Sequence, residues 1–120
     1  MCRRKILVVD DEAGTRASLR MIFKDAYEVL EAGDGAEALK ILQNTRPDVI
    51  LLDLIMSHIN GIEVLKEVKR IAKQLPVIVI TAIRNTEMME AAMELGAFSY
   101  LIKPFDVREL EQIVQRALGC

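Results

Sequence analysis

Three aspartates directly follow uninterrupted apolar runs. Asp10 and Asp11 come after residues 6–9, and Asp53 comes after residues 49–52. An apolar run without alternation that ends in a carboxylate is typical of a strand buried on both faces of a sheet and ending at a functional edge. One such aspartate is most often a turn former or belongs to the start of a helix. Three carboxylates at one edge, however, repel one another and raise each other's pKa values unless a cation lies among them.

Binding of a divalent metal ion is the chemistry that fits these carboxylates. Mg²⁺ and Mn²⁺ prefer oxygen ligands, retain several waters and take one or two protein carboxylates together with substrate oxygens. Thr81 and Lys103 follow two further apolar runs and add a hydroxyl and an ammonium group. A metal ion beside another aspartate and a lysine suits phosphoryl transfer, which depends mainly on positioning and on neutralising charge. An aspartate can itself be the nucleophile and form an acyl phosphate.

Strands and helices alternate regularly along the chain and would position these residues. Short runs rich in valine, isoleucine and leucine predict strands at residues 5–9, 27–32, 48–53, 76–81 and 99–102. Apolar residues three and four apart predict helices around residues 19–23, 38–42, 64–72, 88–95 and 110–117. Five strand–helix units in succession predict a parallel sheet with helices on both faces. Ligands of such sheets bind beyond the carboxyl ends of the strands, so the polar residues are expected at one edge.

Capping residues support the predicted helix boundaries. Asp106 followed by Glu109 has the spacing of a capping box at the start of the last helix. Gly96 and Gly119 stand where helices commonly end in a glycine. Asn60 has a side chain that can cap the third helix.

Length and composition indicate one compact domain over residues 1–120. Apolar residues make up 52% of the chain and charged residues 28%, which excludes a disordered or fibrous protein. The formal net charge is only −2, and the short basic run at residues 3–5 is most simply a solvated segment before a strand. Without a basic face, this segment is not expected to bind nucleic acid by itself.

The sequence predicts a cytoplasmic protein that does not enter a membrane. The apolar run at residues 6–9 is too short for a signal peptide, and no window approaches the roughly 18 apolar residues that span a bilayer. Cys2 and Cys120 lack metal-ligand spacing, and a reducing cytoplasm keeps such thiols free. A disulfide between them is the alternative, if the two ends of the chain lie on the same side of the molecule.

Several spaced motifs together resemble one known family, the receiver domains of two-component response regulators. They are Val8-Val9-Asp10-Asp11-Glu12, Asp53-Leu54 with Met56 and Gly61, Thr81-Ala82, Gly96-Ala97, and Tyr100-Leu101-Ile102-Lys103-Pro104-Phe105. The resemblance covers essentially the whole chain. It implies an α/β flavodoxin-like (βα)5 three-layer sandwich, with a five-stranded parallel sheet in the strand order 2-1-3-4-5.

The resemblance also implies the chemistry of the site. Asp53 would be the phosphoacceptor, receiving its phosphoryl group from a sensor histidine kinase or phosphotransfer protein. Mg²⁺, with Mn²⁺ able to replace it, would be bound by Asp11, Asp53 and the backbone carbonyl of Ile55, and by Asp10 largely through water.

The phosphoryl group itself would be bound by Thr81, Ala82 and Lys103. The bond from Lys103 to Pro104 is expected to be cis. The domain would catalyse only its own phosphorylation and slow self-dephosphorylation, so it is not expected to be an enzyme in the usual sense.

Thr81 and Tyr100 would form the switch that the resemblance implies. Movement of the Thr81 hydroxyl towards the phosphoryl group would let the Tyr100 ring turn inward and change the surface of the fourth helix, fifth strand and fifth helix. A tyrosine that lines the core with a solvated hydroxyl is the alternative. Met89 and Met93 are candidates for contacts with a partner or a second copy across that surface, and ordinary partial burial is the alternative.

Three residues depart from the family pattern in the loop after the third strand. Ser57 replaces a common proline, His58 is the lone histidine, and Asn60 replaces a common aspartate. His58 is most simply a solvated loop residue, with a proton shuttle as the alternative. Ile55 and Ile83 flank the expected path of an attacking water, so we predict a slowly hydrolysed phosphoryl group.

Rival functions fit the residues less well. A flavin protein of this fold needs hydroxyl or glycine residues after the first strand, whereas residues 10–12 would repel a phosphate. Phosphatases that form an aspartyl phosphate place an Asp-x-Asp arrangement there, and it is absent. The remaining alternative is a phosphate-independent, receiver-like interaction module. The last helix and its entry resemble receivers that head transcriptional regulators of the nitrogen-regulation type, and this resemblance implies the N-terminal receiver of such a regulator as one expectation.

Overall fold

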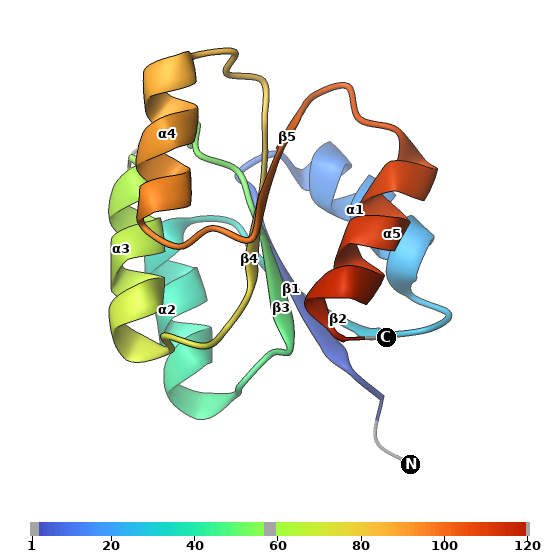
Figure 1. Ribbon diagram of the computed structural model, residues 1–120. Coiled ribbons are helices and arrows are strands. Elements are labelled where there is room, and N and C mark those ends of the chain that lie inside the picture. The colour runs from blue at the N-terminus through green and yellow to red at the C-terminus, as the bar shows by residue number, and fades with distance from the viewer. Residues whose placement is uncertain (1–2, 57–59, 120) are drawn as a thin grey trace.

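A computed structural model describes residues 3–56 and 60–119 of the chain. Within these ranges the sheet consists of parallel strands in the order β2-β1-β3-β4-β5, which confirms the predicted order (Figure 1). The strands are β1 (Lys5–Val9), β2 (Glu28–Ala32), β3 (Val49–Leu52), β4 (Val77–Thr81) and β5 (Ser99–Ile102). Each lies within its predicted range, and three of them are shorter by one or two residues. Asp53 therefore follows β3 instead of ending it.

Helices cover both faces of the sheet and complete three layers. They are α1 (Ala13–Phe23), α2 (Gly35–Asn44), α3 (Gly61–Ile71), α4 (Thr86–Glu94) and α5 (Val107–Ala117). Figure 1 shows α1 and α5 on one face and α2, α3 and α4 on the other. Each helix turns its apolar positions to the sheet, as the three- and four-residue spacing predicts.

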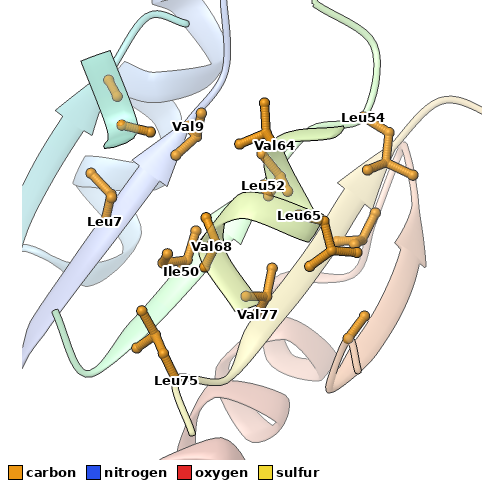
Figure 2. Close-up of a cluster of buried hydrophobic side chains, with 14 of the residues drawn as sticks. Leu7, Val9, Ile50, Leu52, Leu54, Val64, Leu65, Val68, Leu75 and Val77 are labelled. Atoms are coloured by element: carbon orange, nitrogen blue, oxygen red, sulfur yellow. The ribbon is translucent and has the colours of Figure 1, made fainter. Parts of the chain in front are cut away.

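The sheet separates two apolar cores. One lies between the sheet and α2, α3 and α4, with Leu7, Ile50 and Leu65 fully buried (Figure 2). The other lies beneath α1 and α5 and includes Ile6 and Leu110. Successive side chains of a strand point to opposite faces, so a strand with helices on both sides buries every residue. All residues of β3 and β4 are buried, which accounts for their uninterrupted apolar sequences.

Helix ends are held as the capping residues predict. The Asp106 carboxylate accepts hydrogen bonds from the backbone N–H groups of Arg108 and Glu109, and the Asn60 side chain accepts one from Ile62. Gly96 and Gly119 follow α4 and α5 with φ of 101° and 76°, a region that glycine enters without a steric penalty.

The start of β1 and the end of α5 lie side by side. The Arg4 guanidinium donates a hydrogen bond to the Leu118 carbonyl at 2.8 Å. The predictions for Cys2 and Cys120, and those for Ser57 and His58, concern residues outside the described ranges. Among the helices that the structure describes, none has the length and apolar content of a membrane span.

Candidate functional site

The carboxyl ends of the central strands bring the predicted polar residues together. Val9 pairs with Leu52 across β1 and β3, so Asp10 and Asp53 follow paired positions. The Asp53 N–H donates to the Val9 carbonyl at 3.0 Å, which extends this pairing by one residue. On the other side, the Lys103 N–H donates to the Thr81 carbonyl at 2.9 Å. The backbone ladder thus places side chains from four strand ends at one edge.

Lys103 lies between two buried carboxylates. Its Nζ is 3.0 Å from Asp10 Oδ2 and 3.0 Å from Asp53 Oδ2. The side chains of Asp10 and Asp53 are only 4% and 7% exposed. Burial lowers the pKa of Lys103, but the hydrogen bonds and charges of Asp53 and Asp10 outweigh it and raise that pKa overall. The ammonium is therefore protonated and offsets part of the negative charge of Asp10 and Asp53.

Asp10 is held from several directions. Besides the bond from Lys103, its Oδ1 accepts the Glu12 N–H at 2.9 Å, and its backbone carbonyl accepts a hydrogen bond from Arg16 at 2.7 Å. Burial is the largest influence on the Asp10 carboxyl and raises its pKa, whereas repulsion by Asp53 is the smallest. The expected mutual repulsion of carboxylates thus contributes less than desolvation does.

A cavity of about 520 Å³ opens beside this cluster. It is lined by Asp11, Glu12, Asp53, Ile55, Met56, Ala82 and Lys103. The Ile55 side chain is 51% exposed, and its N–H donates to Asp53 Oδ1 at 2.9 Å. Asp10 does not line the cavity, because its oxygens face Lys103 and the Glu12 N–H.

The donors on this cavity suit a hard divalent cation. Within residues 3–56 and 60–119, no three or more His, Cys, Asp or Glu side chains form a metal cage. Mg²⁺ does not need one, because it keeps several waters and takes one or two carboxylates together with substrate oxygens. Asp11 and Asp53, which line the cavity with the backbone of Ile55 beside them, match that requirement.

Thr81 and Tyr100 meet at the backbone of one residue. Thr81 is fully buried, and its Oγ1 accepts the Ile83 N–H at 3.3 Å. The Tyr100 hydroxyl donates to the Ile83 carbonyl at 3.2 Å, while its ring packs on the core beneath α3 and α4. The Tyr100 hydroxyl is therefore bonded to the backbone in this structure. Burial, with a smaller contribution from the charge of Asp53, raises the Tyr100 pKa.

The remaining predicted residues occupy the same edge or the neighbouring surface. The Lys103–Pro104 peptide bond is cis, as the resemblance implies. Ile83 is partly buried against the core. Met89 is half-buried and Met93 is 44% exposed.

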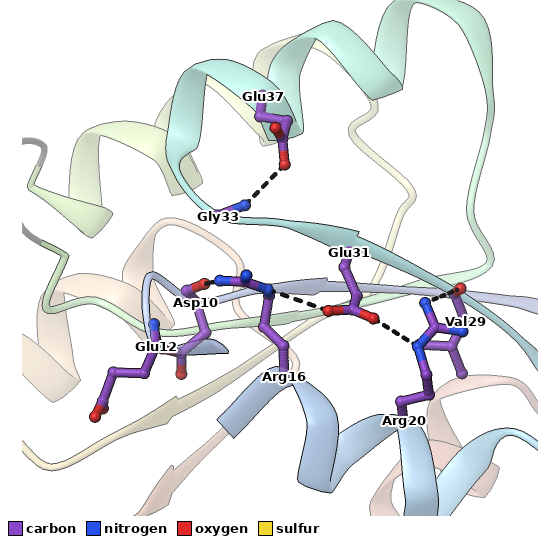
Figure 3. A network of polar contacts seen from close by, with 8 residues as sticks. All are labelled: Asp10, Glu12, Arg16, Arg20, Val29, Glu31, Gly33 and Glu37. Carbon is purple, nitrogen blue, oxygen red and sulfur yellow. Dashed lines mark hydrogen bonds and ion pairs between the residues drawn. The ribbon is translucent and has the colours of Figure 1, made fainter. Parts of the chain in front are cut away.

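Sequence reasoning named Glu12 and Met56 within motifs but did not assign them to the site, where both line the cavity. It missed a polar network behind the acidic turn (Figure 3). In that network, Arg16 and Arg20 of α1 both contact Glu31 of β2. A signal was present, because Arg16 and Arg20 are four residues apart and so share one helix face. Glu31 is a charged residue within a predicted strand, one residue before its end.

Comparison with known proteins agrees with this arrangement. The model of the response regulator receiver domain matches residues 6–115. Sporulation initiation phosphotransferase F of Bacillus subtilis is 40% identical over 98% of this chain and 96% of its own length. Regulatory protein AtoC of Escherichia coli is 43% identical over 95% of this chain, which spans 25% of that protein. The structure of Vibrio cholerae chemotaxis protein CheY4 is 35% identical, with a TM-score of 0.90, over 98% of this chain and 100% of its own.

The fold, the polar cluster at the carboxyl edge of its sheet and these similarities lead to one assignment. The chain belongs to the receiver domains of two-component response regulators.

Proposed function

We propose that Asp53 accepts a phosphoryl group from the phosphohistidine of a sensor histidine kinase or phosphotransfer protein, in a reaction that depends on Mg²⁺. The observation that carries this proposal is the position of Lys103, which bridges Asp10 and Asp53 at the mouth of an open cavity. That geometry presents a carboxylate nucleophile beside a fixed positive charge, as transfer of an anionic group requires.

The transfer exchanges one bond to phosphorus for another. A carboxylate oxygen of Asp53 forms a P–O bond while the P–N bond to the partner's imidazole breaks, and the imidazole nitrogen takes a proton from solvent. Lys103 would pair with one phosphoryl oxygen. Thr81 and the backbone of Ala82, which lie at the end of β4, would contact another.

Mg²⁺ would be held by Asp11, Asp53 and the backbone carbonyl of Ile55, with Asp10 acting largely through water and Mn²⁺ able to replace the ion. When bound, the ion supplies positive charge that offsets the negative charge of the phosphoryl group. The chain's own residues orient the Asp53 carboxylate, through the Ile55 N–H on one oxygen and the Lys103 ammonium on the other. Ile55 and Ile83 would also slow hydrolysis, so that the domain dephosphorylates itself slowly.

Phosphorylation would be transmitted through Thr81 and Tyr100. Both hydroxyls bond to the Ile83 backbone, so a movement of Thr81 reaches Tyr100 through a single residue. Tyr100 lies on β5 beside α4 and α5, and this α4-β5-α5 surface would change to control an output. Met93 and Phe98, 44% and 42% exposed, support a contact there with a partner or with a second copy of the chain.

The output is a separate proposal. We infer that residues 1–120 form one receiver domain. The chain spans a quarter of the AtoC regulatory protein and nearly all of sporulation initiation phosphotransferase F. We propose two outputs: relay of the phosphoryl group to a further protein, which the phosphotransferase among the relatives supports, and control of transcription by a domain that follows, which relatives named as transcriptional regulators support.

The direct test is intact-mass measurement after incubation with acetyl phosphate and Mg²⁺. We expect the wild type to gain the mass of one phosphoryl group, and chelation of the metal to abolish the gain. Asp53→Asn should gain nothing. Asp25→Asn, which removes an exposed carboxylate far from the cavity, is the matched control and should behave as the wild type.

A different result would overturn the proposal. Absence of any mass gain in the wild type would favour the phosphate-independent interaction module. A gain in Asp53→Asn equal to that of the wild type would show that another residue is the acceptor.

A further inference from the structure

Arg16 joins the acidic turn after β1 to strand β2. From the first turns of α1, its Nη1 donates to the backbone carbonyl of Asp10 at 2.7 Å, and its Nε donates to Glu31 Oε1 at 3.1 Å (Figure 3). The planar guanidinium presents its donors in a fixed fork, so engaging two acceptors sets its orientation. The Asp10 carbonyl is thereby tied to a group whose own position is fixed by another strand.

Neighbouring groups restrict the conformation of the Arg16 side chain. The side chains of Arg16 and Glu31 are only 21% and 29% exposed, and the second Glu31 oxygen accepts a bond from Arg20 Nε at 2.5 Å. Gly33 lies against the guanidinium, since a Cβ built at Gly33 would be 3.5 Å from Arg16 Nη1. Charge-assisted bonds of this kind, partly shielded from water, keep a defined geometry better than exposed ion pairs do.

Fixing the Asp10 carbonyl fixes the backbone of Asp11. The carbonyl of Asp10 and the N–H of Asp11 belong to one planar peptide unit. The Asp10 N–H is itself bonded to the Ala32 carbonyl at 3.1 Å, so that residue is held on both sides. The peptide plane that Arg16 holds therefore restricts the directions in which the Asp11 side chain can leave the chain towards the cavity.

We propose that Arg16 is a positioning residue for the divalent-ion site, acting through the Asp10–Asp11 peptide plane, with Glu31 orienting it. This inference rests on the metal site of the proposed function. Groups behind the ligands of a metal site commonly change its affinity by 10-fold or more when they are removed. Arg16 would act on metal affinity without touching the metal.

If only the charge of Arg16 mattered, its removal would strengthen binding of the divalent ion, whereas a positioning role predicts weaker binding. A guanidinium near a cation site repels the cation, so its removal should strengthen binding if electrostatics decided the result. Glu31 offsets that charge through the direct ion pair. If Arg16 acts by position, its removal weakens binding even though a positive charge has been lost.

The experiment is titration of the full chain with Mn²⁺, following the free ion by electron paramagnetic resonance. We expect Arg16→Met to weaken Mn²⁺ binding about 10-fold. Arg20→Met is the matched control: it removes the same charge from the same helix face, a bond to Glu31 and a bond to the Val29 carbonyl, but no contact with Asp10. It should leave the affinity within about twofold of the wild type.

Arg16→Lys keeps the positive charge but changes the hydrogen-bonding geometry. It is the second test variant and replaces Arg16→Met if that variant does not fold. Lysine keeps the charge but lacks the fork that reaches both acceptors, so binding should again weaken. All titrations are run well below the melting temperatures determined by circular dichroism. Competition by Mg²⁺ should show the same order of affinities.

The outcomes distinguish failure of the metal site from failure of the positioning role of Arg16. Weak or absent Mn²⁺ binding by the wild type, or binding that survives Asp11→Asn unchanged, would overturn the metal site of the proposed function. Asp11-dependent binding that is equal in wild type and Arg16→Met, or weakened equally by Arg20→Met, would overturn the positioning role alone. Tighter binding by Arg16→Met would show that charge decides.

Discussion

At the scale of single residues, the charge balance of the cavity depends on Lys103. One ammonium group forms ion pairs with two carboxylates that are almost completely buried, and so offsets about half of their negative charge. Taking carboxylates out of water is costly unless they are paired and hydrogen-bonded. The same lysine thus pairs with buried carboxylates of the fold and lines the cavity that an incoming anion would enter.

Replacing Lys103 should destabilise the protein when divalent ions are absent. Breaking a buried ion pair costs about 3–5 kcal/mol because an uncompensated charge remains. Lys103 keeps 20% of its side chain exposed, so we expect Lys103→Met to lower the free energy of unfolding by about 2 kcal/mol, after allowance for screening by solvent. Urea denaturation in the presence of a chelator measures this change. Lys40→Met, at an exposed position of α2, is the control, and equal losses in both variants would contradict the prediction.

Asp10→Asn should have the opposite effect. Burial raises the pKa of the Asp10 carboxyl, so its ionised form is less favourable in the fold than in the unfolded chain. The asparagine side chain keeps an oxygen that can accept the Glu12 N–H but carries no charge. We expect the melting temperature of the variant to exceed that of the wild type by a few degrees at pH 7 in a chelator. A lower melting temperature would show that the bond to Lys103 is worth more than the cost of burial.

At the scale of elements, the segment after Asp53 depends on a close approach of two backbones. Gly61 begins α3 and its N–H donates to the Leu54 carbonyl at 3.0 Å. A Cβ built at Gly61 would lie 2.3 Å from the Leu54 Cα. A backbone atom cannot move aside as the end of a flexible side chain can. Any side chain at position 61 would therefore clash with Leu54, which explains the glycine in this motif.

Gly61→Ala should therefore destabilise the fold by about 2–3 kcal/mol, the usual cost of overpacking that displaces backbone. Chemical denaturation measures it. Gly33→Ala is a suitable control, because a Cβ there meets only the Arg16 side chain at an ordinary distance of 3.5 Å. Similar stabilities of the two variants would mean that the start of α3 can shift freely.

The contact between α1 and β2 should give a pH-dependent contribution to stability. The hydrogen bond from Arg20, supported by Arg16, lowers the pKa of Glu31 below its ordinary value of 4.5. A lowered carboxyl pKa stabilises the fold above the unfolded pKa, and this stabilisation is lost as the pH falls through 4.5 towards the folded pKa.

Glu31→Gln should consequently be less stable than the wild type by roughly 1 kcal/mol at pH 7, which is the upper end of the contribution measured for ion pairs near the surface. The difference should shrink as the pH falls below about 4.5. Denaturation curves between pH 7 and pH 3 test this, with Glu28→Gln, exposed on the same strand, as the control. A constant difference across that range would contradict the assigned ion pair.

At the scale of the whole molecule, the three layers and the gathering of polar residues at the carboxyl edge of the sheet were predicted correctly from the sequence. Continuous apolar runs such as residues 49–52 indicate strands buried on both faces, whereas the strand order was implied by the resemblance to receiver domains. The bridge from Lys103 to Asp10 and Asp53 could not be read in advance, because it depends on rotamers of residues far apart in the chain. The spacing of Arg16 and Arg20 indicated a shared helix face, but their common partner Glu31 was identified only from the structure.

Metal binding should stabilise the entire domain and not only the cavity. The proposed ligands come from the ends of different strands, Asp11 after β1 and Asp53 after β3, so they are close together only in the fold. An ion that binds the folded chain alone adds RT ln(1 + [L]/Kd), about 2.7 kcal/mol at 100 times Kd. In a chain of this size, we expect saturating Mg²⁺ to raise the melting temperature by roughly 10 °C. The rise should increase with the logarithm of the ion concentration and disappear in Asp11→Asn, which keeps the fold but loses a ligand. Identical melting curves with chelator and with Mg²⁺ would show that the carboxyl edge of the sheet does not form a Mg²⁺ site, despite its similarity to the metal sites of the family.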